Sequence, residues 1–302
     1  QTTPYPLLSG LVGSEMCIRD RLKMEQLLYG DPVARQLDEI SFKAFQDAKS
    51  NNKTPHLTAI TVGDNSASLL YVSRKKEKAE QLGVEFNWLK LDENTTQENL
   101  NELIQEQSKT TDGLIVQLPL PNHLNSEDVI NCIPPDVDVD GLTSYNLGSL
   151  FSNEYKLIPA TSLAVLELLN FYEIKTVDKA IVIAGRSRLV SSPLAKILSS
   201  KSYNANVTVI HSKTSNQKQF ITQADIFISA VGSAKLYDFS YFKKGATIID
   251  IGISTVDGKN YGDIDTQNLS EVVSYRSPFP GGVGPITVSA LFFNLSRLVK
   301  TS

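Results

Sequence analysis

Tyr71 and Lys75 are a candidate pair for proton-transfer chemistry. They are four residues apart in the predicted helix 68–82, so their side chains share one face. A lysine amine that is removed from water has a lowered pKa and can act as an acid or a base. The alternative is an ordinary solvated helix face, because Arg74 and Lys76 make this a basic run.

Gln117 is a second candidate, because it stands near the end of a predicted buried strand. The run 113–118 is apolar apart from this residue, and Pro119 and Pro121 close it. A polar side chain at the end of such a strand tends to face a cleft. The alternative is a hydrogen-bonded residue at the edge of the sheet.

Three alternating aspartates, Asp136, Asp138 and Asp140, precede a glycine. The pattern resembles the start of an EF-hand calcium loop, but the twelfth position is Leu147 where such a loop needs Glu. A turn or a binding carboxylate therefore remains. No metal is expected elsewhere, because the three histidines and two cysteines lack metal-ligand spacing.

A strand–turn–helix segment, 184–193, is a candidate phosphate-binding site. Its single glycine, Gly185, matches the pattern G-x-G-x-x-G poorly. The turn nevertheless leads into a predicted helix, whose N-terminus offers free N–H groups to an anion such as a pyrophosphate. The alternative is a structural turn with Pro193 in the first helical turn.

The next predicted strand, 207–211, is followed by Ser212 and Lys213. Enzymes that select NAD usually place Asp or Glu here to bind the ribose 2′-hydroxyl. This chain has no carboxylate at this position that would repel a 2′-phosphate, and Arg186 lies in the preceding turn. Both cations could also be ordinary solvated surface residues.

The order of predicted elements indicates the fold class. Strands and helices alternate on both sides of a Pro/Asp/Gly-rich connection, which predicts mostly parallel α/β structure with a nucleotide-binding unit in the second half. We expect strands at 56–62, 84–91, 113–118, 180–184, 207–211, 226–230 and 247–251, and helices at 32–49, 68–82, 96–107, 162–172, 193–200 and 286–299.

Composition narrows the classes of function. The chain has 302 residues, 41% of them hydrophobic, which suits one large domain or two ordinary ones. A net charge of −4 gives no reason to expect a nucleic-acid partner. No apolar run approaches the ~20 residues of a membrane span. With only Cys17 and Cys132, a disulfide framework is not expected and a cytoplasmic location fits.

The first 23 residues differ in character from the rest. The run 12–20 resembles translated adaptor sequence, and the segment lacks the features of a signal or transit peptide. We therefore expect 1–23 to be a non-native or disordered leader, with Met24 a candidate native start. Deleting the leader should leave the melting temperature and activity unchanged.

Four segments together resemble one family, the bifunctional methylenetetrahydrofolate dehydrogenase/methenyltetrahydrofolate cyclohydrolases, over about Leu28 to Val299. They are 62–75, 112–121, 138–141 and 278–287, and the second and fourth are highly specific. The resemblance implies two α/β domains around a cleft. A folate-binding catalytic domain would comprise 24–144 plus 286–302, and a Rossmann-like NADP-binding domain would comprise 145–285.

The resemblance also implies an activity. The enzyme would oxidise 5,10-methylenetetrahydrofolate with NADP and hydrolyse the methenyl product to 10-formyltetrahydrofolate, as a cytoplasmic homodimer acting on tetrahydrofolate derivatives. The implied catalytic residues are Lys75, Tyr71, Gln117 and Asp140. The implied coenzyme-binding residues are Gly185, Arg186, Ser187, Ser212 and Ile253. The implied substrate-binding residues are Tyr71, Val116, Gln117, Leu118, Asp140, Pro280, Gly281 and Gly282.

The chain departs from the family pattern only around the coenzyme. Ser191 replaces the second glycine of the coenzyme turn, Ala234 replaces a usual proline, and Ala160, Ser162 and Ala164 alter the motif P-C-T-P-x-G. A cyclohydrolase-only enzyme with a weakened coenzyme site is therefore the alternative. A non-catalytic nucleotide-binding protein is a third hypothesis, and the intact folate and lysine motifs argue against it.

Overall fold

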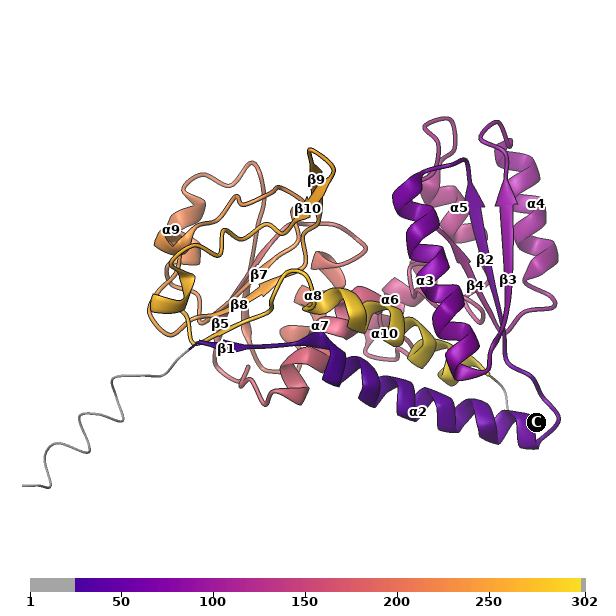
Figure 1. Ribbon diagram of the computed structural model, residues 1–302, viewed down its shortest axis with the longest axis horizontal. Helices are drawn as coiled ribbons and strands as arrows, with labels where there is room; N and C mark the ends of the chain where they lie inside the picture. The colour runs from indigo at the N-terminus through magenta and orange to yellow at the C-terminus, as the bar shows by residue number, and fades with distance from the viewer. Residues whose placement is uncertain (1–24, 300–302) are drawn as a thin grey trace, which may run out of the picture.

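The structure, a computed structural model, describes residues 25–299 as two α/β lobes, each built on a parallel sheet (Figure 1). The predicted leader at 1–23 lies outside these residues, as does Cys17. Within them, no helix is long and apolar enough to cross a membrane. The predicted α/β fold class, with its mostly parallel pairing, is confirmed.

The first lobe contains a three-stranded sheet in the order β3-β2-β4. Its central strand, β2, is buried almost throughout, as expected for a parallel strand covered on both faces. Strand β3 follows β2 on one side and β4 lies on its other side, so the strand order reverses between β2 and β4. At such a point α/β sheets bind ligands. The elements are β2 (His56–Val62), α3 (Ser66–Leu82), β3 (Glu85–Leu91), α4 (Gln97–Gln107), β4 (Gly113–Val116) and α5 (Ser126–Cys132).

The second lobe contains a six-stranded sheet in the order β1-β11-β8-β7-β5-β6. All its pairings are parallel, and the strand order reverses between β5 and β7, as in other doubly wound sheets. Its strands are β1 (Gln26–Leu27), β5 (Ala180–Ala184), β6 (Asn206–Ile210), β7 (Ile226–Ser229), β8 (Thr247–Asp250) and β11 (Tyr275–Arg276). Two helices, α8 (Ser191–Leu198) and α9 (Gln217–Ile221), and an antiparallel hairpin, β9 (Ser254–Val256) with β10 (Lys259–Tyr261), complete it.

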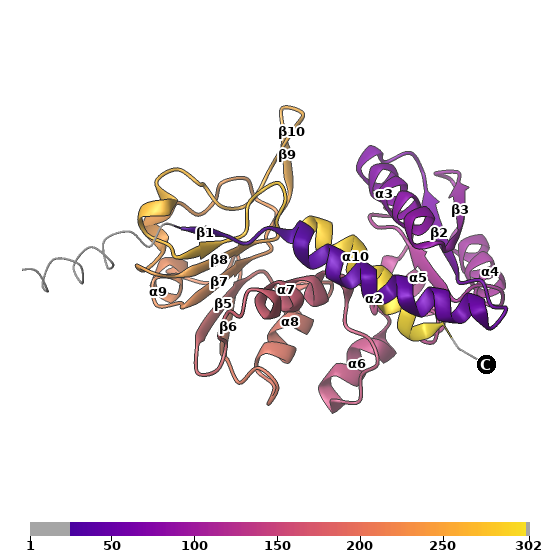
Figure 2. The same cartoon turned by 60° about the horizontal axis from the view of Figure 1, so that its bottom comes forward.

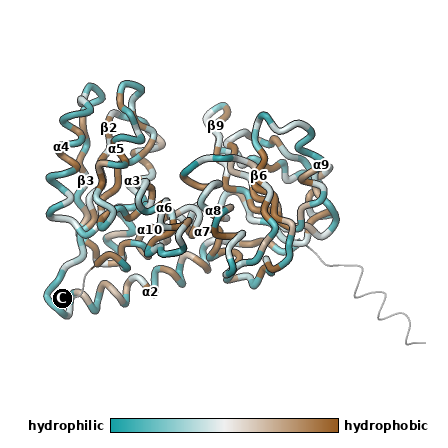
Figure 3. Tube along the Cα trace, turned by 180° about the vertical axis from the view of Figure 1, so that it is seen from behind, coloured by the Kyte–Doolittle hydropathy of each residue, from teal (hydrophilic) through white to brown (hydrophobic). Residues whose placement is uncertain are grey.

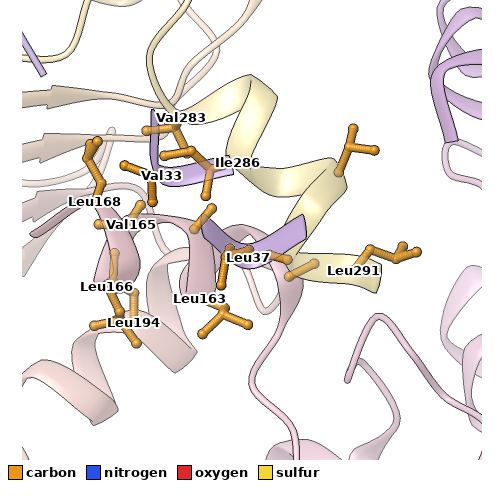
Figure 4. Close-up of a cluster of buried hydrophobic side chains, with 14 of the residues drawn as sticks. Val33, Leu37, Leu163, Val165, Leu166, Leu168, Leu194, Val283, Ile286 and Leu291 are labelled. Carbon is orange, nitrogen blue, oxygen red and sulfur yellow. The ribbon is translucent and has the colours of Figure 1, made fainter. Parts of the chain in front are cut away.

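Two long helices, α2 (Gly30–Ser50) and α10 (Val283–Leu298), join the lobes, and α7 (Ala160–Phe171) packs against both of them. Helices α2 and α10 run side by side from the second lobe to the first (Figures 1 and 2). Val33 and Leu37, one turn apart on α2, pack with Ile286 of α10 and Val165 of α7 in a shared apolar cluster (Figure 4). This cluster makes the helical layer a common core for both lobes.

Hydrophobic residues concentrate in the strands and in the inner faces of the helices, whereas the outer turns of both lobes are hydrophilic (Figure 3). Each lobe also has an apolar cluster of its own, one around Ile60 and Leu114 and the other around Phe227 and Ile248. Each sheet is therefore stabilised by an apolar cluster of its own, in addition to the cluster that both lobes share.

All the predicted strands and helices are present, with ends shifted by a few residues. The predicted strand 113–118 ends at Val116, because the chain turns toward Pro119, although Gln117 N still donates to Ile60 O at 2.9 Å. Several short elements were not predicted, among them β1 and α6 (Ser144–Ser152). A two-residue strand has too few residues for a periodic signal, and its pairing with β11 is a long-range contact.

Candidate active site

Helix α3 presents Lys75 to the interior of the first lobe. The helix begins at the N-cap Asn65, whose side chain accepts a hydrogen bond from Ser68 N, and ends at Gly83 in the left-handed conformation. Lys75 is half-buried, whereas the neighbouring Lys76 is exposed. The basic run is therefore not uniformly solvated, and one of its lysines is drawn inward.

Gln117 meets Lys75 across 42 residues of sequence. Lys75 Nζ donates to Gln117 Oε1 at 3.0 Å, and Gln117 Nε2 donates to Leu118 O at 2.9 Å. The second bond fixes which end of the amide faces the lysine. Gln117 lies at the carboxyl end of β4, next to the point where the strand order reverses.

Asp140 is the carboxylate whose charge affects the pKa of Lys75. Burial lowers the pKa of Lys75, and the negative charge of Asp140 opposes that shift. Burial likewise raises the pKa of Asp140, opposed by Lys75 and reinforced by Asp138. The two groups act on each other without forming a salt bridge within residues 25–299. The site thus holds a lysine whose proton is easier to remove than usual.

The other two aspartates of the alternating run have different roles. Asp136 is exposed. Asp138 is buried, and its Oδ2 accepts hydrogen bonds from Thr143 N and Asn146 Nδ2, both at 2.8 Å. Asp138 therefore organises the start of α6, and of the three carboxylates only Asp140 is coupled to Lys75.

Asn294 of α10 fixes the backbone beside Asp140, and the sequence did not single it out. Its side-chain amide donates to Val139 O at 2.9 Å and to Ile158 O at 2.8 Å. These carbonyls belong to the two segments that pass between the lobes. A polar residue in an otherwise apolar helix stripe was the only signal available.

Three other residues of the predicted folate site lie close to these groups along the chain. Tyr71 is half-buried, one turn before Lys75 on α3. Val116 is buried in β4, and Leu118 follows Gln117 with its carbonyl also accepting from Ser68 Oγ at 3.3 Å. The structure gives Tyr71 no hydrogen bond to another described side chain, so its role rests on position.

The glycine loop before α10, residues 280–282, contacts the start of α2. Gly30 N donates to Gly281 O at 2.8 Å, and a Cβ on Gly30 would come within 1.9 Å of Gly282 O. Gly281 has φ +99°, a conformation that side chains disfavour, and Pro280 is exposed. Close backbone approach at Gly30 and the φ of Gly281 therefore explain two of the glycines.

The predicted coenzyme turn has a backbone that only glycine fits. Gly185 has φ +120°, and a Cβ there would lie 2.7 Å from Ala230 O and 2.8 Å from Ser191 Oγ. Arg186 and Ser187 are exposed in the turn, and Ser187 Oγ accepts from Val190 N at 3.2 Å. The turn follows β5, beside the point where the strand order reverses.

Ser212 and Ile253 are exposed and follow β6 and β8 respectively, so they lie at the same carboxyl edge of the sheet as Gly185. A parallel sheet brings these ends together, although they are far apart in the sequence. The donors, cations and cramped glycine turn at this edge fit a phosphate-bearing dinucleotide.

The departures from the family pattern leave the backbone of the coenzyme turn intact. Ser191 is fully buried, and its hydroxyl has no hydrogen-bond partner among the described residues. Ser162 Oγ donates to Val190 O at 3.1 Å, and Ala160 and Ala164 are buried in α7. Ala234 is half-buried in the loop after β7. Gly185 keeps its positive φ despite these changes.

Comparison with known proteins covers both lobes. The family model for the tetrahydrofolate dehydrogenase/cyclohydrolase catalytic domain matches residues 28–140, and the model for the NAD(P)-binding domain of the same family matches residues 159–302. The bifunctional protein FolD of Lactobacillus acidophilus is 37% identical over 279 residues, which are 92% of this chain and 98% of that protein. That of Ligilactobacillus salivarius is 40% identical over 257 residues, covering 84% and 90%.

Solved structures agree. The FolD methylenetetrahydrofolate dehydrogenase/cyclohydrolase from Campylobacter jejuni is 35% identical and superposes with a TM-score of 0.88, covering 91% of this chain and 98% of that one. The enzyme from Trypanosoma brucei, complexed with NADP cofactor and inhibitor, is 29% identical with a TM-score of 0.86, covering 91% and 97%.

Proposed function

Because the chain belongs to the tetrahydrofolate dehydrogenase/cyclohydrolase family, we propose that Lys75 transfers protons in the hydrolytic half of its activity. The protein oxidises 5,10-methylenetetrahydrofolate to 5,10-methenyltetrahydrofolate with NADP and hydrolyses that product to 10-formyltetrahydrofolate. The two reactions share one folate carbon but make different demands on the protein.

Oxidation needs alignment rather than proton transfer. NADP supplies the hydride acceptor when it is bound. The residues that would hold it are the turn at Gly185, with Arg186 and Ser187, and Ser212 and Ile253, which follow β6 and β8 at the same edge of the sheet. The backbone at Gly185, which leaves no room for a Cβ, and the positive dipole end of α8 fit a pyrophosphate.

Hydrolysis needs a group that moves protons. Water adds to the cationic methenyl carbon, the water oxygen loses its protons as the formyl carbonyl forms, and the bond from this carbon to one ring nitrogen breaks as that nitrogen gains a proton. Lys75 with its lowered pKa can accept the first proton and return one to the departing nitrogen. Gln117 holds the lysine Nζ in place, and Asp140 would bind the polar edge of the pterin ring.

The observation that carries this assignment is the Lys75–Gln117 hydrogen bond at 3.0 Å combined with burial of the amine. A solvated lysine would keep a mobile side chain and an ordinary pKa, and neither would suit it as a base near neutral pH. Tyr71, one turn away on α3, would line the folate pocket together with Val116, Leu118 and the loop 280–282.

Lys75→Met is the test, since it keeps the length of the side chain and removes the ionisable amine. We expect hydrolysis of methenyltetrahydrofolate, followed by absorbance, to fall by roughly 10²–10⁴-fold. NADP reduction should fall far less, because removal of a hydride needs no base. The exposed Lys76 supplies the control: Lys76→Met should keep both activities.

Normal hydrolysis by Lys75→Met, or a selective loss in Lys76→Met, would show that the wrong lysine has been assigned. The cyclohydrolase-only alternative gains no support, because relatives that match 92% of this chain are bifunctional proteins. The non-catalytic hypothesis is excluded for the same reason.

Three further features remain proposals. We propose domain boundaries at 24–144 plus 286–302 and at 145–285, supported by the separate sheets of the two lobes apart from β1, which pairs with β11 in the second sheet. We also propose a cytoplasmic homodimer, supported by the low cysteine content and by the frequency of two-fold dimers. Light scattering should give twice the chain mass of 33.2 kDa, and the mass of a single chain would contradict the dimer.

A further inference from the structure

Two buried carboxylates lie beneath the coenzyme edge of the second lobe. Asp263 is fully buried, and the hydrogen bonds of its carboxylate all come from the end of β7 and the loop that follows. Its Oδ2 accepts from Ser229 Oγ at 2.7 Å and from Val231 N at 2.9 Å, and its Oδ1 accepts from Ser233 N at 2.7 Å. One side chain thus fixes two backbone N–H groups of that loop.

Asp250, the last residue of β8, in turn fixes the backbone of Asp263. Its carboxylate accepts from Asp263 N and from Ile264 N, both at 3.0 Å. Its own N–H donates to Ser277 Oγ at 2.8 Å, just before the loop that carries Gly281. The two carboxylates therefore form a chain of bonds from β8 to the loop after β7.

Two glycines leave the space that this arrangement needs. A Cβ on Gly252 would lie 2.0 Å from the carboxylate of Asp263, and a Cβ on Gly262 would lie 2.1 Å from Asp250 Oδ2. Neither carboxylate forms a salt bridge with any residue of the range 25–299. The carboxylates are therefore held by N–H and O–H donors in a fitted space rather than by cations.

The loop that Asp263 holds lies at the point where the strand order reverses, between β5 and β7. This is the position at which a doubly wound sheet binds its ligand. Ala230 O, immediately before the two fixed N–H groups, forms the wall that excludes a Cβ from Gly185. Any shift of this loop would therefore move one wall of the coenzyme turn.

We infer that Asp263, seated on Asp250, is a positioning residue that sets coenzyme affinity by fixing the loop 230–233 against the turn at Gly185. The inference rests on the proposed placement of NADP at Gly185 and Arg186. It assigns Asp263 no contact with the coenzyme, and it predicts that the hydrolytic site in the other lobe is independent of it.

Asp263→Asn tests the inference, because the amide keeps the shape but turns an N–H group toward at least one backbone donor. We expect the Kd for NADPH, measured by its fluorescence on titration, to rise roughly tenfold or more, the cost of a hydrogen bond to a charged group. Methenyl hydrolysis, which uses no coenzyme, should stay near the wild-type rate. Asp257→Asn, exposed in the hairpin turn between β9 and β10, should leave both measurements unchanged.

A lower melting temperature with an unchanged Kd would mean that Asp263 only stabilises the lobe, and this would overturn the inference. If Asp263→Asn does not fold, Ser229→Ala decides, since it removes one bond to the carboxylate: a Kd raised about threefold supports the inference, and an unchanged Kd overturns it. Arg186→Ala is measured alongside. Unchanged affinity in Arg186→Ala refutes the coenzyme placement itself, whereas unchanged affinity only in the Asp263 and Ser229 variants refutes the positioning role.

Discussion

Asp250 should make the stability of this protein depend on pH in a direction opposite to that of an ordinary paired carboxylate. Burial raises its pKa from 3.8 to about 6. Backbone N–H groups of Asp263, Ile264 and Gly252 oppose the shift, and the charge of Asp263 adds to it. The other titratable group beside this pair, Tyr237, has a pKa raised to about 12 by burial and stays neutral.

The sign follows from which state binds the proton more tightly. Between pH 3.8 and about 6, the folded protein holds a proton on Asp250 that the unfolded chain has released. The contribution of Asp250 to stability is therefore greatest below pH 3.8 and is lost as the pH rises to about 6. A pKa difference of about two, at about 1.4 kcal/mol for each pH unit, amounts to about 3 kcal/mol.

Asp250→Asn removes the titration, since the amide cannot ionise. Relative to wild type, the variant should gain about 3 kcal/mol between pH 4 and pH 7, on top of a constant loss from the backbone bond that an amide cannot accept. Urea denaturation followed by far-UV circular dichroism at several pH values measures this difference. A difference that is flat with pH, or that falls as the pH rises, would refute the reasoning.

Two other predictions concern the predicted coenzyme site and the helices that join the lobes. Arg186→Ala should weaken NADP binding by roughly tenfold or more with little change for NAD, because only NADP offers a 2′-phosphate; equal losses in titrations of both coenzymes would rule out that contact. Gly30→Ala should lower the free energy of unfolding by about 1–3 kcal/mol in urea denaturation, since its Cβ would come within 1.9 Å of Gly282 O. Gly148→Ala, in α6 with no atom near the added methyl, should be neutral or stabilising, and similar losses in both variants would argue against the steric explanation.

The alternation of strands and helices could be predicted from local pattern alone. The strand β2 was predicted with its observed ends, and α3 to within two residues, because apolar runs and the C-cap Gly83 act over a few neighbouring positions. The short strand β1 could not be predicted, because its two residues pair with β11, far along the chain, and such a contact leaves no periodic signal. Helix α6 was missed although its N-cap Thr143 and the carboxylate of Asp138 hold its start from nearby in the sequence.

The sequence by itself determined which residues belong to the candidate site, because motifs of fixed type and spacing name Lys75, Gln117 and Asp140. It could not determine their state. The pKa of Lys75 is lowered by burial of its amine, and the side chain is held by its hydrogen bond to Gln117 Oε1, across 42 residues of sequence. Desolvation depends on every atom that excludes water from a group, so only the tertiary structure decides it.

The roles of Asp250 and Asp263 likewise could not be predicted from the sequence. In the sequence they are aspartates next to strand ends and glycines, like several others that are exposed. Their role depends on three segments converging at one edge of the second sheet, where Ser229, Val231 and Ser233 direct their donors at a single carboxylate. Parallel strands can bring these segments together only through crossover connections, so their meeting is a property of the folded topology rather than of any local pattern.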